Sequence, residues 1–172
     1  MAIRFFVYSL LVISVIAFFA SSEDEQKKLK VEEKPMIVFH DSIMYTLTEE
    51  SMTRIVQSTR AERYKSRDLM YDGKIITASK NGLYTDYMSA DLIVKRQDKF
   101  KFLNNAKYNR ENFIELTSDE ILYDAKTKIA TNSLPFQGRY YSHILNGSHL
   151  YFDTNKSILK AQKAHFEVEL AK

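Results

Sequence analysis

The side chains around residue 146 are the best candidates for metal chemistry in this chain. His143 and His149 flank Asn146-Gly147, a dipeptide typical of hairpin turns, so the two imidazoles would approach each other across a hairpin. Asp153 is the nearby carboxylate that would act as a third ligand. A metal site needs such a ligand in a fixed geometry, and two histidines beside a turn are also ordinary surface residues. We expect no metal ion and no cofactor.

Ser, His and Asp all occur, but the motifs of other common catalytic sites are absent from the sequence. There is no cysteine, which excludes a thiolate nucleophile, a cysteine zinc site and structural disulfides. No Gly-x-Ser-x-Gly elbow and no glycine-rich phosphate loop occurs. Carboxylates are paired at Glu49-Glu50 and Asp119-Glu120, but adjacent residues of a strand point to opposite faces. We therefore predict that the protein is not an enzyme.

The composition favours a β-rich globular domain that does not bind nucleic acid. Aromatic residues reach 13%, all of them Tyr or Phe, and only four Gly and two Pro are present. Aromatic and β-branched residues favour strands. The net charge of +3 comes from interspersed acids and bases, which is too small and too mixed for a nucleic-acid surface.

Three four-residue segments share one pattern. An apolar residue comes first, an apolar or aromatic residue second, an aromatic residue third and Asp fourth. They are Leu69–Asp72, Ile121–Asp124 and Leu150–Asp153. Each precedes a few polar residues and another apolar run, which is the pattern of a strand, a turn and a returning strand. Glycine after Asp or Asn adds turn signals at Asp72-Gly73, Asn81-Gly82 and Asn146-Gly147. The repetition predicts a stack of hairpins.

Alternation of apolar and polar residues indicates long strands elsewhere. Apolar residues occupy odd positions from Ile37 to Leu47, which predicts one strand, or two with a bulge at Asp41-Ser42. Residues 53–64 have mixed polarity and would also suit a helix. The last strand places Phe166, Val168 and Leu170 on one face. Regularly spaced strands without a convincing helix predict an all-β sandwich, jelly roll or open barrel.

The aromatic residues of these strands are expected to point into the domain. They are Phe100, Phe102, Tyr123, Phe136, Phe152 and Phe166. They would either fill a packed core or line a furrow between two parts of a sheet that do not fully close. The sequence leaves both alternatives open.

The N-terminal segment predicts a membrane anchor. Residues 1–22 are charged only at Arg4 and the amino terminus, and a helix of ~20 residues spans the ~30 Å hydrocarbon layer. Residues of this anchor include Phe5, Leu10, Ile16 and Ala20. Acidic residues follow from Glu23, so the positive-inside rule places the N-terminus in the cytoplasm. A signal peptide cleaved near Ala20-Ser21-Ser22 is the alternative. Residues 23–35 would form a charged linker, and residues 36–172 the exported domain.

This order of elements resembles the LptC family, the single-pass inner-membrane component of the lipopolysaccharide export machine. The likeness is closest over residues 118–170. There a strand leads to Tyr123-Asp124, Pro135-Phe136 lies in the next strand, and Gly147–Asp153 precedes the closing strand. The resemblance implies a twisted, partly open β-jelly roll of the LptA kind, preceded by one transmembrane helix.

The resemblance also implies partners and sites. The domain would receive lipopolysaccharide from an inner-membrane ABC transporter of the LptBFG type and pass it to an LptA-like periplasmic protein. The groove for acyl chains would be lined by Phe100, Phe102, Ile114, Leu116, Tyr123, Phe152, Phe166 and Val168. The transporter-facing strand would present Ile37, Phe39, Ile43 and Tyr45. The LptA-facing end would present Phe166, Val168 and Leu170.

Four functions therefore remain as hypotheses. The first is a non-enzymatic lipid-transfer bridge anchored in the inner membrane. The second is a soluble LptA-like periplasmic bridge released by signal cleavage. The third is an anchored envelope enzyme, which would need His143, His149 and Asp153 around one pocket. The fourth is a structural envelope β-domain with a solidly filled interior.

Overall fold

The computed structural model describes residues 34–47, 52–78, 84–111 and 113–168, and residues 35–172 form one compact unit. The predicted anchor with Phe5, Leu10, Ile16 and Ala20 lies outside the described residues, as do the turn at Asn81-Gly82 and Leu170. No helix long and apolar enough to cross a membrane occurs among the residues that are described.

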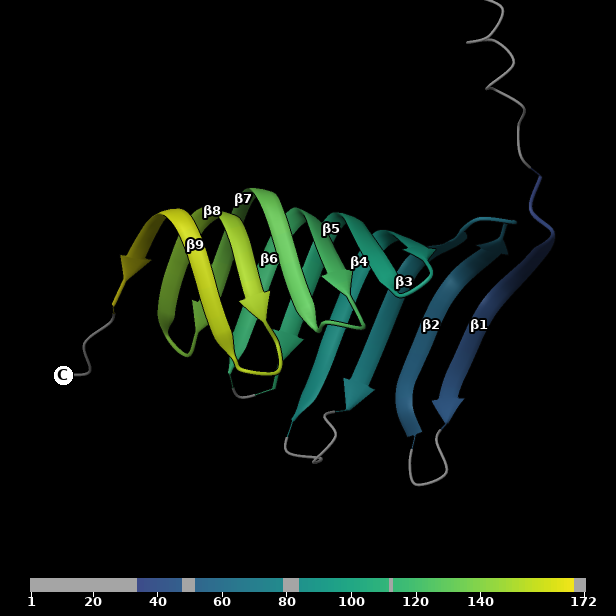
Figure 1. Cartoon of the computed structure of the whole chain (residues 1–172), viewed down its shortest axis with the longest axis horizontal. Helices are drawn as coiled ribbons and strands as arrows, with labels where there is room; N and C mark the ends of the chain where they lie inside the picture. Colours follow the sequence, from purple (N-terminus) through teal and green to yellow (C-terminus); the bar gives the residue numbers. More distant parts are fainter. Residues whose placement is uncertain (1–33, 48–51, 79–83, 112, 169–172) are drawn as a thin grey trace, which may run out of the picture. The chain divides into compact units, whose positions relative to one another are not determined.

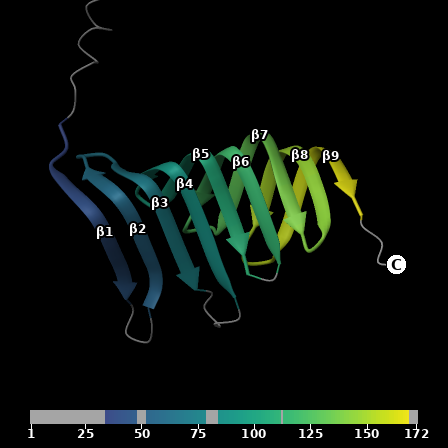
Figure 2. The same ribbon diagram turned by 180° about the vertical axis from the view of Figure 1, so that it is seen from behind.

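Within the described residues, nine antiparallel strands form a single sheet in which each strand pairs with the next one along the chain (Figure 1). The strands are β1 Ile37–Leu47, β2 Met52–Arg63, β3 Asp68–Ala78, β4 Thr85–Arg96, β5 Lys99–Arg110, β6 Ile114–Asp124, β7 Ile129–Tyr140, β8 His143–Asp153 and β9 Ile158–Glu167. The predicted all-β stack of hairpins is confirmed. The helical interpretation of residues 53–64 is wrong, because this segment is β2. From both sides, β1 and β9 lie at opposite ends of the sheet (Figures 1 and 2).

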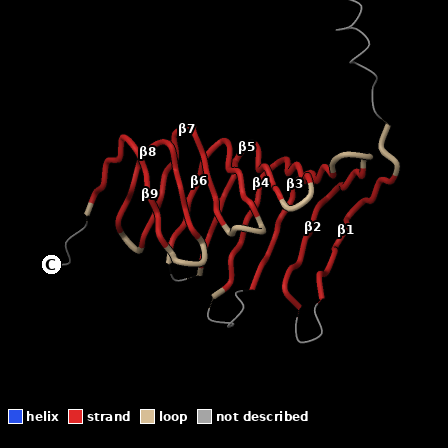
Figure 3. The backbone as a smooth tube through the Cα atoms, in the orientation of Figure 1, coloured by secondary structure: helices blue, strands red, loops and turns tan. Residues whose placement is uncertain are grey.

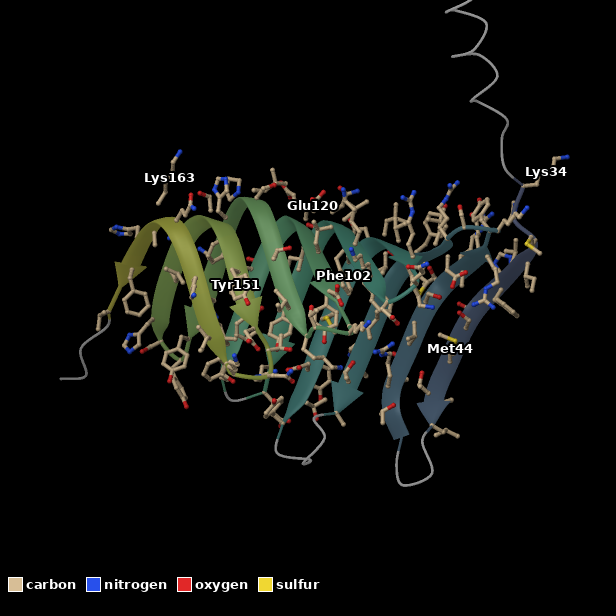
Figure 4. All side chains as sticks on the ribbon, in the orientation of Figure 1. Lys34, Met44, Phe102, Glu120, Tyr151 and Lys163 are labelled. Carbon is tan, nitrogen blue, oxygen red and sulfur yellow. The ribbon has the colours of Figure 1, made fainter. Side chains whose placement is uncertain are left out.

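The pairing between neighbouring strands skips residues near the middle of each strand, and the sheet bends along this line (Figure 3). Several interrupting residues have positive φ, namely Asp41, Asp72, Asn104, Asn105, His149 and Lys163. Asp and Asn tolerate this conformation better than most residues, and a single such residue redirects a strand. Side chains reinforce the bend: the Thr59 hydroxyl donates to Asp72 at 3.0 Å, and the Asn105 amide donates to Asp91 at 2.7 Å. Glu120 and Lys163, which Figure 4 labels, lie along this bend.

Two predicted hairpin turns are part of this bend instead. Asp72-Gly73 lies within β3, and Asn146-Gly147 lies within β8. Their glycines have no positive φ, and they provide space rather than a reversal of the chain. A Cβ on Gly73 would lie 2.5 Å from Cδ1 of Ile93, and one on Gly147 would lie 3.1 Å from Cε1 of Phe136. Both predictions of a turn are therefore wrong.

The other two repeated segments do end in turns, as predicted. Asp124 accepts hydrogen bonds from the backbone N–H groups of Lys126 and Thr127. Asp153 accepts the equivalent pair from Asn155 and Lys156. Aspartate closes such turns because its carboxylate reaches backbone donors two and three residues ahead. The hydrogen bond from the backbone of Thr127 is the main reason that the pKa of Asp124 is lowered.

The bend brings the two halves of the sheet face to face around one core. Among the described strands, Cα atoms come within 8 Å only between neighbours in the sheet, so across the interior the halves meet through side chains. The largest fully buried side chains are Tyr108, Phe102, Phe152, Ile75, Ile93 and Leu116. Tyr108 of β5 meets Phe152 of β8 edge to face, with ring centroids 5.2 Å apart. Phe102, another of these buried residues, is labelled near the middle of the sheet in Figure 4.

Candidate functional site

The predicted groove residues occupy the inner face of the sheet. Six of them are buried, with exposed fractions between 0 and 8%: Phe100, Phe102, Ile114, Leu116, Tyr123 and Phe152. Phe136 is buried as well. Their inward orientation is confirmed, and their contact with lipid stays a prediction. Burial raises the pKa of Tyr123. In the structure these side chains touch one another, so no acyl chain reaches them unless the two halves separate.

One row of the inner face crosses all nine strands. Cross-strand partners share a face of a sheet, and successive pairs connect Met44, Val56, Ile75, Met88, Tyr108, Leu116, Gly138, Leu145 and Phe166. We call these residues the inner apolar row. It is buried from Val56 to Gly138 and exposed at both ends, where Met44 is 47% and Phe166 51% exposed. The row is therefore a continuous apolar track from one edge of the sheet to the other.

The β1 edge is apolar on both faces. β1 pairs only with β2, and Ile37, Phe39, Ile43 and Tyr45 are all exposed. These four residues do not share one face, because the strand bends at Asp41, where a bulge was one of the two expectations. Ile37 and Phe39 lie on the inner face, in line with buried Phe100 and Ile93 respectively. Ile43 and Tyr45 pair with Gln57 and Ile55 and lie on the outer face.

The β9 edge is the second uncovered end. β9 pairs only with β8. Phe166 lies opposite Leu145, which packs against the core, so Phe166 is on the inner face as predicted. Phe166 and Val168 are nevertheless about half exposed, because no further strand covers them among the described residues. The His143 ring lies beside Phe166, with centroids 5.9 Å apart. Unpaired edge strands favour pairing with another sheet.

A polar inner row runs beside the inner apolar row, toward the open side of the bend. It comprises Thr46, Arg54, Thr77, Asp86 and Arg110, linked by successive cross-strand pairs. The Thr77 hydroxyl is buried and has no hydrogen-bond partner. Arg54 places its guanidinium 5.4 Å from the centre of the Phe100 ring in the opposite half. Apolar and polar rows side by side make the inner face amphipathic.

Asp86 and Arg110 form the core of this polar inner row. Arg110 donates from Nε and Nη2 to the two oxygens of Asp86, at 2.7 and 2.9 Å. The Tyr108 hydroxyl also donates to Asp86, at 2.7 Å. Burial, followed by the charge of Asp86, raises the pKa of Tyr108. This cluster is not apparent in the sequence, because Asp86 and Arg110 are 24 residues apart and only the register of β4 and β5 brings them together.

The three side chains considered as candidate metal ligands do not form a cluster. His143 and His149 lie in the same strand, β8, and do not face each other across a hairpin. His149 lies beside Ser148 at the bend. No group of three or more His, Asp or Glu side chains that could hold a metal ion occurs in the described part of the chain.

Comparison with solved structures finds a similar fold in LptH of Pseudomonas aeruginosa. That crystal structure is described as the LptA-homologous periplasmic component of the conserved lipopolysaccharide transport device. The two chains are 13% identical, with a TM-score of 0.42, and the likeness covers 80% of this chain and 97% of LptH. No protein-family profile and no curated protein sequence matches the chain.

Proposed function

We propose that this protein is a non-enzymatic lipid carrier that bridges two partners in lipopolysaccharide export. The inner apolar row carries the proposal, because it runs without interruption from the β1 edge to the β9 edge. A lipid with several acyl chains cannot cross an aqueous compartment with those chains exposed. Burial of each CH₂ group is worth ~0.8 kcal/mol, and the polar inner row would face the headgroup.

The two uncovered edges support the bridging part of the proposal. A like-folded partner that adds its edge strand to β1 or β9 would extend both the sheet and the inner apolar row. Exposed apolar side chains at each edge, such as Phe39 and Phe166, would become buried on pairing. Edge strands with exposed apolar side chains are otherwise an aggregation hazard for a monomer. One partner at each edge would cover these apolar side chains, which would explain why both edges are exposed.

The assignment of partners follows from the resemblance to the LptC family. The β1 side would dock on an LptBFG-type ABC transporter, which supplies the energy from ATP. The β9 side would pass lipopolysaccharide to an LptA-like periplasmic protein. Residues 1–22 would anchor the chain in the inner membrane by a single helix, with the N-terminus in the cytoplasm and the sheet in the periplasm. The soluble LptA-like bridge is the alternative, and the mass of the mature N-terminus in cells distinguishes the two.

Charged substitutions at each edge test this proposal. In the full chain, Ile43→Glu places a charge in the β1 edge, and Phe166→Glu places one in the β9 edge. Leu134→Glu is the matched control, because Leu134 is similarly apolar and exposed but lies at the bend. We expect Ile43→Glu to reduce co-purification of the transporter at least tenfold, and Phe166→Glu to do the same for the LptA-like partner. Retention of both partners by both variants would refute edge pairing.

A further inference from the structure

The open side of the bend is closed by side chains from both halves of the sheet. Arg110, at the end of β5, donates from Nη1 to the hydroxyl of Ser157 at 2.9 Å. Ser157 belongs to the turn between β8 and β9, in the opposite half. The Tyr84 hydroxyl donates to the backbone oxygen of Thr154, in the same turn, at 3.4 Å. These two contacts cross the opening that separates the free rims of the halves.

Arg110 is the centre of this closure. Its Cζ lies 3.8 Å from the Tyr84 ring centre and 5.7 Å from the ring centre of Phe152, which belongs to the opposite half. Asp86 fixes the direction of the guanidinium by accepting two of its hydrogen bonds. The remaining nitrogen, Nη1, is thereby aimed at Ser157. A planar guanidinium is suited to such simultaneous contacts, and a lysine would not reproduce them.

The contacts between the rims are polar, and polar contacts suit a closure that has to open. A buried ion pair is a weak source of stability, since apolar residues of similar volume often stabilise a protein as well or better. When the rims separate, water solvates the freed guanidinium and hydroxyl groups. An apolar seam would gain no such compensation and would lose ~25 cal/mol for every Å² exposed. The polar closure therefore makes separation of the rims less costly than an apolar seam would.

The lipid proposal requires such a separation. Tyr108, Phe102 and Phe152 occupy the interior and are at most 1% exposed. An acyl chain reaches the inner apolar row only after these side chains move apart. Separation of the rims need not break hydrogen bonds between neighbouring strands, because across the interior the halves meet only through side chains among the described strands. The described structure is thus the closed form of a carrier.

We propose that Arg110, oriented by Asp86, is a latch that holds the two rims together through Ser157 and the turn of Thr154, and that its release opens the interior to lipid. This inference rests on the proposed function and adds how access to the inner apolar row is controlled. Release breaks the two hydrogen bonds across the opening, separates Arg110 from the Phe152 ring and leaves the Asp86–Arg110 pair intact. The two halves of the sheet then move apart at the bend, while the nine described strands stay paired with their neighbours.

Thiol labelling tests the latch without any lipid. The chain has no native cysteine, so Ala130→Cys introduces a single thiol at an inner position that is 1% exposed. Under native conditions, the labelling rate reports how often the interior opens. Ser157→Ala, added to Ala130→Cys in the full chain, removes the Arg110 contact and keeps its pair with Asp86. We expect labelling to accelerate about tenfold, which corresponds to ~1.4 kcal/mol.

Thr59→Ala is the matched control, because the Thr59 hydroxyl bonds Asp72 at the bend, away from the rims. It should change labelling no more than about twofold. Tyr84→Phe, which removes the second contact across the opening, should act like Ser157→Ala. Urea at low concentration should hardly alter the accelerated rate, since local opening exposes little surface.

Two results would overturn the latch. One is unchanged labelling in both Ser157→Ala and Tyr84→Phe. The other is a urea dependence of labelling equal to that of global unfolding, which would show that the substitutions only destabilise the fold. Because no lipid is present, failure of the proposed function would leave the labelling result unchanged. Conversely, a failed latch would leave the edge-pairing experiment unaffected.

Discussion

Replacement of Gly73 by alanine provides a quantitative test of the bent sheet. Gly73 follows Asp72 in the middle of β3, and its φ lies outside the left-handed region, so alanine brings no backbone strain. The added Cβ would lie 2.5 Å from Cδ1 and 3.0 Å from Cγ1 of Ile93. Ile93 is fully buried, and its side chain has little space to retreat. We expect Gly73→Ala to lower the free energy of unfolding by about 1–3 kcal/mol, the usual cost of overpacking.

A second substitution identifies the cause of this loss. Ile93→Val removes Cδ1, the atom nearest to the new methyl group, and alone should cost about 0.5–1.5 kcal/mol. In the double variant the clash is relieved in part, so the combined loss should be about 1 kcal/mol smaller than the sum of the single losses. Urea unfolding of the four proteins, with the midpoint and slope fitted together, measures this coupling.

Additive losses would refute the bend at Gly73. If Asp72-Gly73 were a hairpin turn, alanine would be unfavourable because of backbone conformation, and Ile93→Val would bring no relief. Gly138→Ala is the control, because its Cβ would lie 3.1 Å from Cδ2 of Leu116 and touch nothing of Ile93. The losses from Gly138→Ala and Ile93→Val should therefore add.

Three further predictions concern the core and its ionisable groups. Phe152→Ala should lower the free energy of unfolding by about 3–5 kcal/mol in urea, because the ring is fully buried against Tyr108. The pKa of Tyr108 is raised in the folded protein, so the fold loses stability as pH rises above the ordinary tyrosine value of about 10. Tyr108→Phe removes this ionisable group and should reduce the loss of stability between pH 9 and 11. The lowered pKa of Asp124 stabilises the fold above its ordinary value of about 3.9, and this effect is lost as pH falls through the folded-state pKa; Asp124→Asn should flatten the stability profile below pH 4.

The parts of the fold that were predictable depend on local patterns. Phe100 and Phe102 alternate with lysines, and both are buried as the alternation requires. The turns after Asp124 and Asp153 use hydrogen bonds within four residues, so the sequence contains everything that forms them. Pairing of each strand with the next follows from short connections, which is why the stack of hairpins could be predicted.

Most of the bend could not be predicted, because residues such as Asp72-Gly73 carry the same signals as turns. Only at Asp41 did the sequence predict an irregularity, as one of two alternatives. Asp72-Gly73 looks like a hairpin turn, yet β3 continues through it in the register set by β2 and β4. Asp41 likewise reverses the faces of β1, so Ile43 and Tyr45 lie on the outer face although their spacing matches that of Ile37. The local patterns in the sequence do not determine which residues of neighbouring strands pair with each other. The inner apolar row depends entirely on this pairing.

The most direct test of the account is whether lipid contacts the inner face of the sheet. A small diazirine-bearing side chain can replace Met88, a buried member of the inner apolar row, and in a separate protein Tyr87, its neighbour on the opposite face of β4. Irradiation of the full chain in cells that export lipopolysaccharide should then yield lipopolysaccharide adducts from position 88 and none above background from position 87. Equal adducts from both positions, or adducts from position 87 alone, would contradict the account.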